Sequence, residues 1–351
     1  MILPDLDDLL AGLRVVSIRM RVPFRGVEHR EAALMQGPVG WGEFSPFLEY
    51  PPGEASRWLA SAIEAAWEGW PAPVRDRVPV NATVPAVSAE DVAAVLARYD
   101  GCRTAKVKVA ERGQSLDDDV CRVAAVRDVM GPDARVRVDA NGGWDVDQAV
   151  AALGALAAYG LEYAEQPCAS VEQLTELRIA LARKGIDVLI AADESIRKAE
   201  DPLRVAREQA ADIIVVKVAP LGGVRRALDI AQECGLPTVV SSALDTSVGI
   251  AAGAALAAAL PALPYACGLA TVALLAGDVA RPSVVPVDGS IGVGPAAVDE
   301  ALVDALAASD ERTQWWRDRM TACHAVLAWH VGQLDPTSST RQAGGQVGGR
   351  G

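Results

Sequence analysis

The chain has 351 residues and a formal net charge of −13, and about half of its residues are hydrophobic. This length suits a large barrel with a smaller second domain, and the acidic balance argues against nucleic acid or an anionic membrane surface as a partner. The six cysteines form no C-x-x-C motif, which argues against a zinc site. The first residues lack the pattern of a secretory signal, and the most apolar run, 248–260, is too short to span a bilayer. We therefore expect a cytoplasmic protein.

The first 77 residues predict a small α+β domain. Alternation of apolar and polar residues indicates strands, and the spacing of Trp58, Leu59, Ile63 and Trp67 keeps one apolar helical face. The predicted elements are three strands followed by a helix, at 13–22, 31–36, 41–44 and 53–70. Pro71-Ala-Pro73 marks the boundary.

Residues 78–281 predict a parallel β/α barrel, because strands and helices alternate with short connections. The predicted strands are 78–84, 104–110, 135–140, 161–166, 188–193, 212–218, 237–243 and 265–270. The predicted helices between them are 89–99, 116–130, 146–159, 171–184, 202–210, 224–234 and 248–260. The alternative is an open doubly wound sheet. No G-x-G-x-x-G follows an early strand, and polar residues end most strands. A barrel gathers these ends around one mouth, so it is favoured.

The remaining residues predict a return to the N-terminal domain and then a tail. Residues 282–334 contain extended pieces and two helices near 297–308 and 311–331, which we expect to pack back on the first domain. Residues 335–351 are rich in Ser, Thr, Gln and Gly without an apolar pattern, so we expect them to be disordered.

Three carboxylates end successive predicted strands. Asp139 follows the alternating segment Arg135-Val-Arg-Val, and Glu165 and Asp193 end the next two strands. In a β/α barrel these side chains face one mouth, where three carboxylates repel one another unless a cation lies between them. Oxygen ligands without His or Cys favour a hard ion, Mg²⁺. Helix capping explains any one of these residues, but not all three at matched spacing.

Three lysines complete the candidate site. Lys106 and Lys108 alternate along the second predicted strand and point into the barrel, and Lys217 ends the sixth strand on the opposite side. Clustering and partial burial both disfavour the ammonium form, so we expect a lowered lysine pKa that suits a general base. The three histidines all lie outside the barrel segment, which leaves lysine as the candidate base. Taken alone, Lys217 also fits a surface residue.

The motifs together resemble the enolase superfamily, in its muconate lactonizing enzyme subgroup. They are Lys106-Val-Lys108, Asp139-Ala-Asn141, Glu165-Gln-Pro167, Asp193-Glu194-Ser195 and Lys217-Val-Ala-Pro-Leu-Gly-Gly223, and their order and spacing match over about residues 10–300. The resemblance implies a modified (β/α)7β barrel of the (β/α)8 type, under an N-terminal α+β capping domain that C-terminal segments complete. Gly40-Trp-Gly-Glu-Phe-Ser-Pro-Phe47 and Val80-Asn-Ala-Thr-Val-Pro-Ala86 further resemble actinobacterial members that dehydrate a cyclohexadiene carboxylate in menaquinone biosynthesis.

The resemblance also implies roles. Asp139, Glu165 and Asp193 would hold Mg²⁺, with Mn²⁺ as a substitute, and this ion would bind the substrate carboxylate. Lys108 would abstract the α-proton, with Lys106 keeping its pKa low, and Lys217 would stabilise the enediolate from the opposite face. The remaining residues are expected around the ion and the substrate: Asn141 and Glu194 as partners of the ligands, Ser241, Ser242 and Gly268 at the substrate tail, and Arg25 in a loop that closes over the mouth.

Three functions remain open at this point. A lyase would use Lys108 as its base, whereas an N-acylamino acid racemase or dipeptide epimerase would use Lys108 and Lys217 as two bases. A non-catalytic binding module would not need lysines beside the ion. The predicted partner is a small carboxylate, and either a monomer or a homo-oligomer agrees with the sequence.

Overall fold

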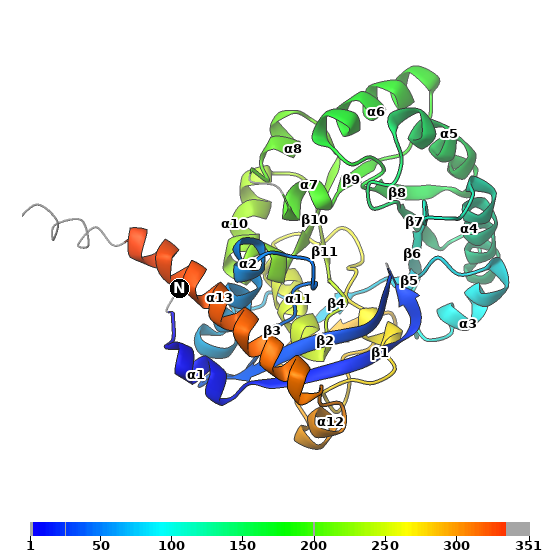
Figure 1. Ribbon diagram of the computed structural model, residues 1–351. Coiled ribbons are helices and arrows are strands. Elements are labelled where there is room, and N and C mark those ends of the chain that lie inside the picture. Colours follow the sequence, from blue (N-terminus) through cyan, green and yellow to red (C-terminus); the bar gives the residue numbers. More distant parts are fainter. Residues whose placement is uncertain (1–2, 25, 199–200, 335–351) are drawn as a thin grey trace, which may run out of the picture.

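The computed structural model describes residues 3–24, 26–198 and 201–334, with side chains to residue 331. Two units are visible in Figure 1: a ring of strands with helices outside it, and a flat sheet crossed by the last helix. The predicted tail, 335–351, lies outside the described residues. The predicted domain boundaries stay a prediction.

The N-terminal unit, called the cap below, is a three-stranded antiparallel sheet in the order β1-β2-β3. Its strands are β1 (Arg14–Phe24), β2 (Val27–Gln36) and β3 (Trp41–Phe44). A short helix, α1 (Leu6–Ala11), precedes them, and α2 (Pro52–Ile63) follows with one π-helical turn, η1 (Glu64–Glu68). Gly42 lets α2 approach β3 closely, because a Cβ there would lie 2.1 Å from the Ala62 carbonyl oxygen.

The central sheet has seven parallel strands in the order β11-β10-β9-β8-β7-β6-β5. These are β5 (Ala82–Val84), β6 (Thr104–Lys108), β7 (Arg135–Asp139), β8 (Leu161–Glu165), β9 (Ile190–Ala192), β10 (Ile213–Lys217) and β11 (Thr238–Ser241). The segment at Cys267 and Gly268 joins the two edge strands through single bridges to Val80 and Ser241. The sheet therefore curls into the predicted barrel.

The barrel strands are all shorter than predicted, and two of them differ from the prediction in a further way. The eighth, 265–270, is reduced to those two bridges. The first, 78–84, is divided, because β4 (Arg77–Pro79) pairs antiparallel with the distant β12 (Ser290–Gly292), while β5 belongs to the barrel. A local pattern of apolar residues cannot reveal this change of partner.

Helices cover the outside of the barrel (Figure 1). The main ones are α3 (Val92–Leu96), α4 (Leu116–Met130), α5 (Val146–Leu156), α6 (Val171–Lys184), α10 (Val224–Cys234) and α11 (Ser247–Ala259). Shorter elements are η2 (Ala89–Asp91), η3 (Ala157–Tyr159), α7 (Glu194–Arg197), α8 (Arg204–Arg207), α9 (Val218–Leu221) and η4 (Thr271–Leu274). Helices α4, α6 and α10 have the predicted bounds. Capping boxes at Ser115 and Ser170 fix the starts of α4 and α6.

The C-terminal segments return to the cap. Helix α12 (Glu300–Ala305) precedes α13 (Asp310–Leu334), which crosses the cap sheet in Figure 1. Trp316 of α13 is fully buried, lies edge-on to Phe44 with ring centroids 5.6 Å apart, and donates from Nε1 to a Glu31 oxygen at 2.8 Å. The core of the cap is thus built from both ends of the described chain.

The barrel interior has two layers. The lower layer is an apolar cluster of Tyr163, Ala191, Ile213, Val215 and Val239, with the buried Arg137 guanidinium 4.7 Å from the Tyr163 ring centroid. The upper layer is charged and forms the site described next. Within the described residues, no helix is both long and apolar enough to cross a membrane.

Candidate active site

A pocket at the carboxyl ends of the barrel strands, called the mouth pocket below, is lined by the cap and the barrel together. Its charged lining comprises four cations and one carboxylate. The lining residues are Phe24, Phe47, Thr83, Lys106, Lys108, Asp139, Asn141, Arg197, Lys217, Ser241, Ser242, Ala243, Leu244, Gly268 and Thr271. These four cationic side chains, in a chain of net charge −13, offer groups that an anionic small molecule can bind.

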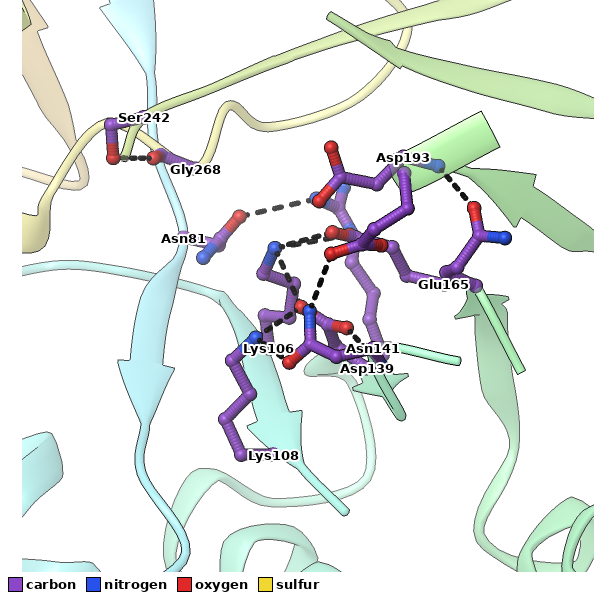
Figure 2. Close-up of polar contacts among 12 residues, drawn as sticks. Asn81, Lys106, Lys108, Asp139, Asn141, Glu165, Asp193, Ser242 and Gly268 are labelled. Carbon is purple, nitrogen blue, oxygen red and sulfur yellow. Dashed lines mark hydrogen bonds and ion pairs between the residues drawn. The ribbon is translucent and has the colours of Figure 1, made fainter. Parts of the chain in front are cut away.

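The sheet register places the three predicted carboxylates on neighbouring strands. Lys108 on β6 lies opposite Asp139 on β7, and Asp139 lies opposite Glu165 on β8. Asp193 comes directly after β9 and is fully buried. In Figure 2 the lysine and carboxylate side chains converge, while Ser242 and Gly268 lie to one side.

The lysines of β6 pair with two of these carboxylates. Lys108 Nζ donates to Asp139 Oδ2 at 2.5 Å and to Asn141 Oδ1 at 2.7 Å. Lys106 Nζ lies 2.9 Å from Glu165 Oε1 and 3.3 Å from Asp139 Oδ2. Two ammonium groups therefore share one oxygen of Asp139.

Asp193 is paired on the other side of the pocket. Lys217 Nζ lies 2.5 Å from Asp193 Oδ2, and Arg197 Nε lies 3.1 Å from Asp193 Oδ1. Arg197 also donates to the Tyr50 hydroxyl of the cap at 3.0 Å. Sequence reasoning missed Arg197. The available signal was its position four residues after Asp193, because residues four apart face each other on a helix.

The environment shifts the pKa values of the acids in different directions. Burial opposes ionisation of Asp139 and Asp193, but the adjacent lysines, with Arg197, outweigh it; the pKa of Asp139 falls well below its ordinary value and that of Asp193 falls to about 2. Burial and the neighbouring Asp139 carboxylate raise the pKa of Glu165 to about 7. Glu165 is therefore the carboxylate whose charge these cations compensate least.

The expected lowering of a lysine pKa is not found at Lys106. Burial lowers the pKa of its ammonium group, but the carboxylates of Glu165 and Asp139 outweigh burial and raise that pKa above the ordinary value. The prediction counted burial and the neighbouring lysine, but it did not include the two acids that the fold places within ion-pair distance. This expectation was wrong for Lys106.

The predicted partner residues lie where they can orient the acids. The backbone amide of Asn141 donates to Asp139 Oδ1 at 3.1 Å. The side chain of Asn141 donates from Nδ2 to Glu194 Oε1 at 3.2 Å. Gln166, which was not predicted, accepts from the Asp193 backbone amide at 2.9 Å. Asn141 and Gln166 both have positive φ, 48° and 39°, so the loops after β7 and β8 are held in a conformation that few side chains adopt.

The predicted residues for the substrate tail also line the mouth pocket. Ser242 Oγ donates to the Gly268 carbonyl at 2.7 Å and lies 2.8 Å from Thr271 Oγ1. Gly268 lets the backbone pass close to Ser241, because a Cβ there would lie 2.5 Å from Ser241 Oγ. Arg25 lies outside the described residues. Thr83 and Thr271 were not predicted.

The donor set fits a hard divalent cation, although the side chains do not converge on one point. The described ranges, 3–24, 26–198 and 201–334, contain no group of three His, Cys, Asp or Glu side chains arranged around a common metal position. The three predicted ligands are each turned toward cationic side chains. All three are buried and supply only oxygen atoms, the chemistry that Mg²⁺ prefers.

Comparison with known families agrees with this combination of cap, barrel and acids. Residues 15–66 match the model of enolase N-terminal domain-like proteins, and residues 88–297 match that of enolase C-terminal domain-like proteins. The chain therefore belongs to the enolase superfamily, whose enzymes generally use a divalent metal.

A relative of known activity shows to which group within the superfamily the chain belongs. The o-succinylbenzoate synthase of Mycolicibacterium smegmatis is 63% identical over 92% of this chain and 98% of its own length. Within the superfamily, the chain belongs to the o-succinylbenzoate synthases, which are carbon-oxygen lyases.

Two solved structures share the fold. The muconate lactonizing enzyme of Pseudomonas fluorescens superposes with a TM-score of 0.72 at 22% identity, covering 85% of this chain and 98% of its own. The N-succinyl Arg/Lys racemase of Bacillus cereus superposes with a TM-score of 0.69 at 19% identity, covering 85% and 97%. At these identities the likeness concerns the fold alone.

Proposed function

We propose that the chain dehydrates 2-succinyl-6-hydroxy-2,4-cyclohexadiene-1-carboxylate to o-succinylbenzoate, a step of menaquinone biosynthesis, in the cytoplasm. The observation that carries the proposal is the mouth pocket itself, where lysines on β6 and β10 face each other across three buried carboxylates. The three lysines and Arg197 in its lining are cationic groups that can bind a substrate with two carboxylates.

Lys108 is the proposed base. Its Nζ takes the proton from the ring carbon that bears the carboxylate, and the electron pair of that C–H bond passes into the carboxylate group to give an enediolate. The pair then returns to form the new ring double bond as the neighbouring hydroxyl group leaves. Lys108 then returns the same proton to the departing oxygen, so the products are o-succinylbenzoate and water and the lysine is unchanged. This role requires that Lys108 be neutral when substrate is bound.

Lys217 and Lys106 are proposed to act through charge. Lys217 approaches from β10, opposite Lys108, and its ammonium group stabilises negative charge that develops on the substrate. Lys106 bridges Glu165 and Asp139. Its ammonium group therefore lies close to that of Lys108, which pairs with the same Asp139.

Asp139, Glu165 and Asp193 are the proposed ligands of Mg²⁺, with Mn²⁺ as a substitute. When bound, such a cation supplies a Lewis acid for the substrate carboxylate. Asn141 orients Asp139, and Arg197 orients Asp193 through their hydrogen bonds. Ser241, Ser242 and the backbone at Gly268 are proposed to receive the succinyl tail, with Arg25 near the closing loop.

Racemisation of N-succinylamino acids is the second candidate. It is favoured by one observation, the placement of Lys108 and Lys217 on opposite sides of the pocket, which two-base chemistry on one carbon requires. The test is incubation with the cyclohexadiene substrate and with N-succinylamino acids in D₂O. Aromatic product without deuterium entering the amino acids supports the lyase alone. Deuterium at the α-carbon with inversion supports both activities, and no turnover of the cyclohexadiene would contradict the proposal.

A further inference from the structure

A buried set of polar side chains joins the cap to one wall of the mouth pocket. The segment 241–246, between β11 and α11, supplies Ser241, Ser242, Ala243 and Leu244 to that wall. Arg30 of β2 and Glu43 of β3 reach this segment from the cap, and they are 3% and 6% exposed. Neither residue lines the mouth pocket.

Arg30 holds the carbonyl groups of the segment. Its Nε donates to the Leu244 carbonyl at 3.0 Å and its Nη2 donates to the Ala243 carbonyl at 3.2 Å. Nη2 also donates to Ser45 Oγ at 3.0 Å, and the guanidinium lies 4.8 Å from the Phe47 ring centroid. A planar group with several donors suits this fork of acceptors, whereas an ammonium group could not reach all of them.

Glu43 holds the amide groups just beyond. Its Oε2 accepts from Thr246 Oγ1 at 2.6 Å, from the Thr246 amide at 3.1 Å and from the Gly249 amide at 2.9 Å. Gly249 makes this approach feasible, because a Cβ there would lie 3.0 Å from Glu43 Oε2. The carboxylate therefore caps the start of α11 from another domain.

The conformation that these contacts hold is a strained one. Leu244 has φ of 63°, in the left-handed region that a leucine rarely adopts, and it is buried. Such a conformation is unfavourable for a residue with a Cβ and persists only where its surroundings fix it. The Arg30 bond to the Leu244 carbonyl is a direct means of doing so.

We propose that Arg30 and Glu43 of the cap are positioning residues that hold segment 241–246 in the conformation that shapes the tail side of the mouth pocket. The inference rests on the proposed function for its substrate, and it adds residues outside the pocket that determine how well the tail binds. Their effect falls on substrate affinity, because the lysines and acids of the chemistry lie on other strands.

A second contact between cap and barrel supplies a matched control. Glu64 in η1 is also 6% exposed, and it also accepts from backbone amides at the start of a barrel helix, those of Val224 and Arg225 in α10. The partners of Glu64 do not line the mouth pocket. Glu43→Gln and Glu64→Gln therefore weaken two similar contacts, of which one touches the proposed tail wall.

The experiment measures KM, kcat and amide hydrogen exchange of purified full-length variants with the cyclohexadiene substrate. Arg30→Met should raise KM about tenfold or more and change kcat less, since it removes binding that the ground state and the transition state share. Glu43→Gln should raise KM severalfold, and both variants should speed exchange within 241–249. Arg30→Lys should restore part of the affinity. Glu64→Gln should lower Tm, with KM within about twofold of the wild type.

Several outcomes would overturn the inference. Unchanged KM and unchanged exchange in folded Glu43→Gln and Arg30→Lys would show that segment 241–246 keeps its conformation without these contacts. An equal rise of KM in Glu64→Gln would show that any loosening of the cap is sufficient. If Arg30→Met does not fold, the other variants decide. If the wild type does not turn over the cyclohexadiene, the proposed function fails, and exchange within 241–249 still decides whether Arg30 and Glu43 hold the segment.

Discussion

The two sides of the mouth pocket each pair two cations with an aspartate, but they do so differently. On the β6–β7 side, Lys106 and Lys108 both approach Asp139 Oδ2. On the β9–β10 side, Asp193 gives Lys217 and Arg197 an oxygen each. Two cations that share one carboxylate oxygen lie closer together, and repel each other more, than two cations that each have an oxygen of their own. The difference favours a base on β6 and a fixed charge on β10.

Replacement of the proposed base should have the largest effect. Lys108→Ala should lower kcat for dehydration by about 10⁴-fold, because one group both removes and returns the proton. Steady-state turnover with a circular-dichroism check of the fold measures this. Lys184→Ala, an exposed lysine at the end of α6, is the control. Turnover by Lys108→Ala within tenfold of the wild type would place the base elsewhere.

Removal of divalent cations tests whether the aspartates of both sides hold one ion. Chelation should reduce turnover by roughly 10³-fold, and added Mg²⁺ should restore it. Binding should also raise Tm, by the equivalent of about 2.7 kcal/mol at a hundredfold excess of ion over Kd. Asp139→Asn and Asp193→Asn should each abolish the rise. A chelator that changes neither turnover nor Tm would contradict the proposed ion.

Exchange of the second lysine for arginine tests the fixed charge. Lys217→Arg keeps a cation beside Asp193 but cannot accept a proton, since arginine stays protonated. Dehydration should fall by about 10- to 100-fold, through altered geometry, while any α-proton exchange on the Lys217 face of N-succinylamino acids should disappear. Retained racemisation in this variant would show that Lys217 is not a base even for the second reaction.

A smaller effect is expected in the pH dependence of the free energy of unfolding. It comes from Glu43 of the cap and not from Asp139 or Asp193. Burial and the neighbouring Asp245 raise the pKa of Glu43 to about 7, from an ordinary value of 4.5. Between these values the folded protein binds more protons than the unfolded chain, so this stabilisation is complete below pH 4.5 and is lost as the pH rises through 7. The free energy of unfolding should fall by up to about 1 kcal/mol per pH unit in this window.

Urea unfolding between pH 5.5 and 8 measures that slope. Glu43→Gln should flatten it, and Glu64→Gln shows how far the loss of any cap carboxylate changes it. Parallel curves for the wild type and Glu43→Gln would show that Glu43 does not titrate in this range.

The sequence predicted the barrel because its local signals were strong. Capping residues such as Ser115 and Ser170, with glycines after the helices, defined elements that the structure confirms. It predicted which acids and lysines lie close together, because strand ends in a barrel must meet. It could not predict the pairing of β4 with β12, the role of Arg197, or the direction of the Lys106 pKa, since each depends on partners that are distant in sequence or fixed only by side-chain geometry.

The construction of the cap from both ends of the chain has a consequence for synthesis. Phe44 leaves the ribosome about 270 residues before Trp316, which covers it. At 5–20 residues per second, that delay is roughly 15–50 s. During this time the barrel can form, while the apolar face of the cap is not yet covered by α13. The apolar face of the cap is thus open to chaperones and proteases until α13 has been synthesised and packs against it.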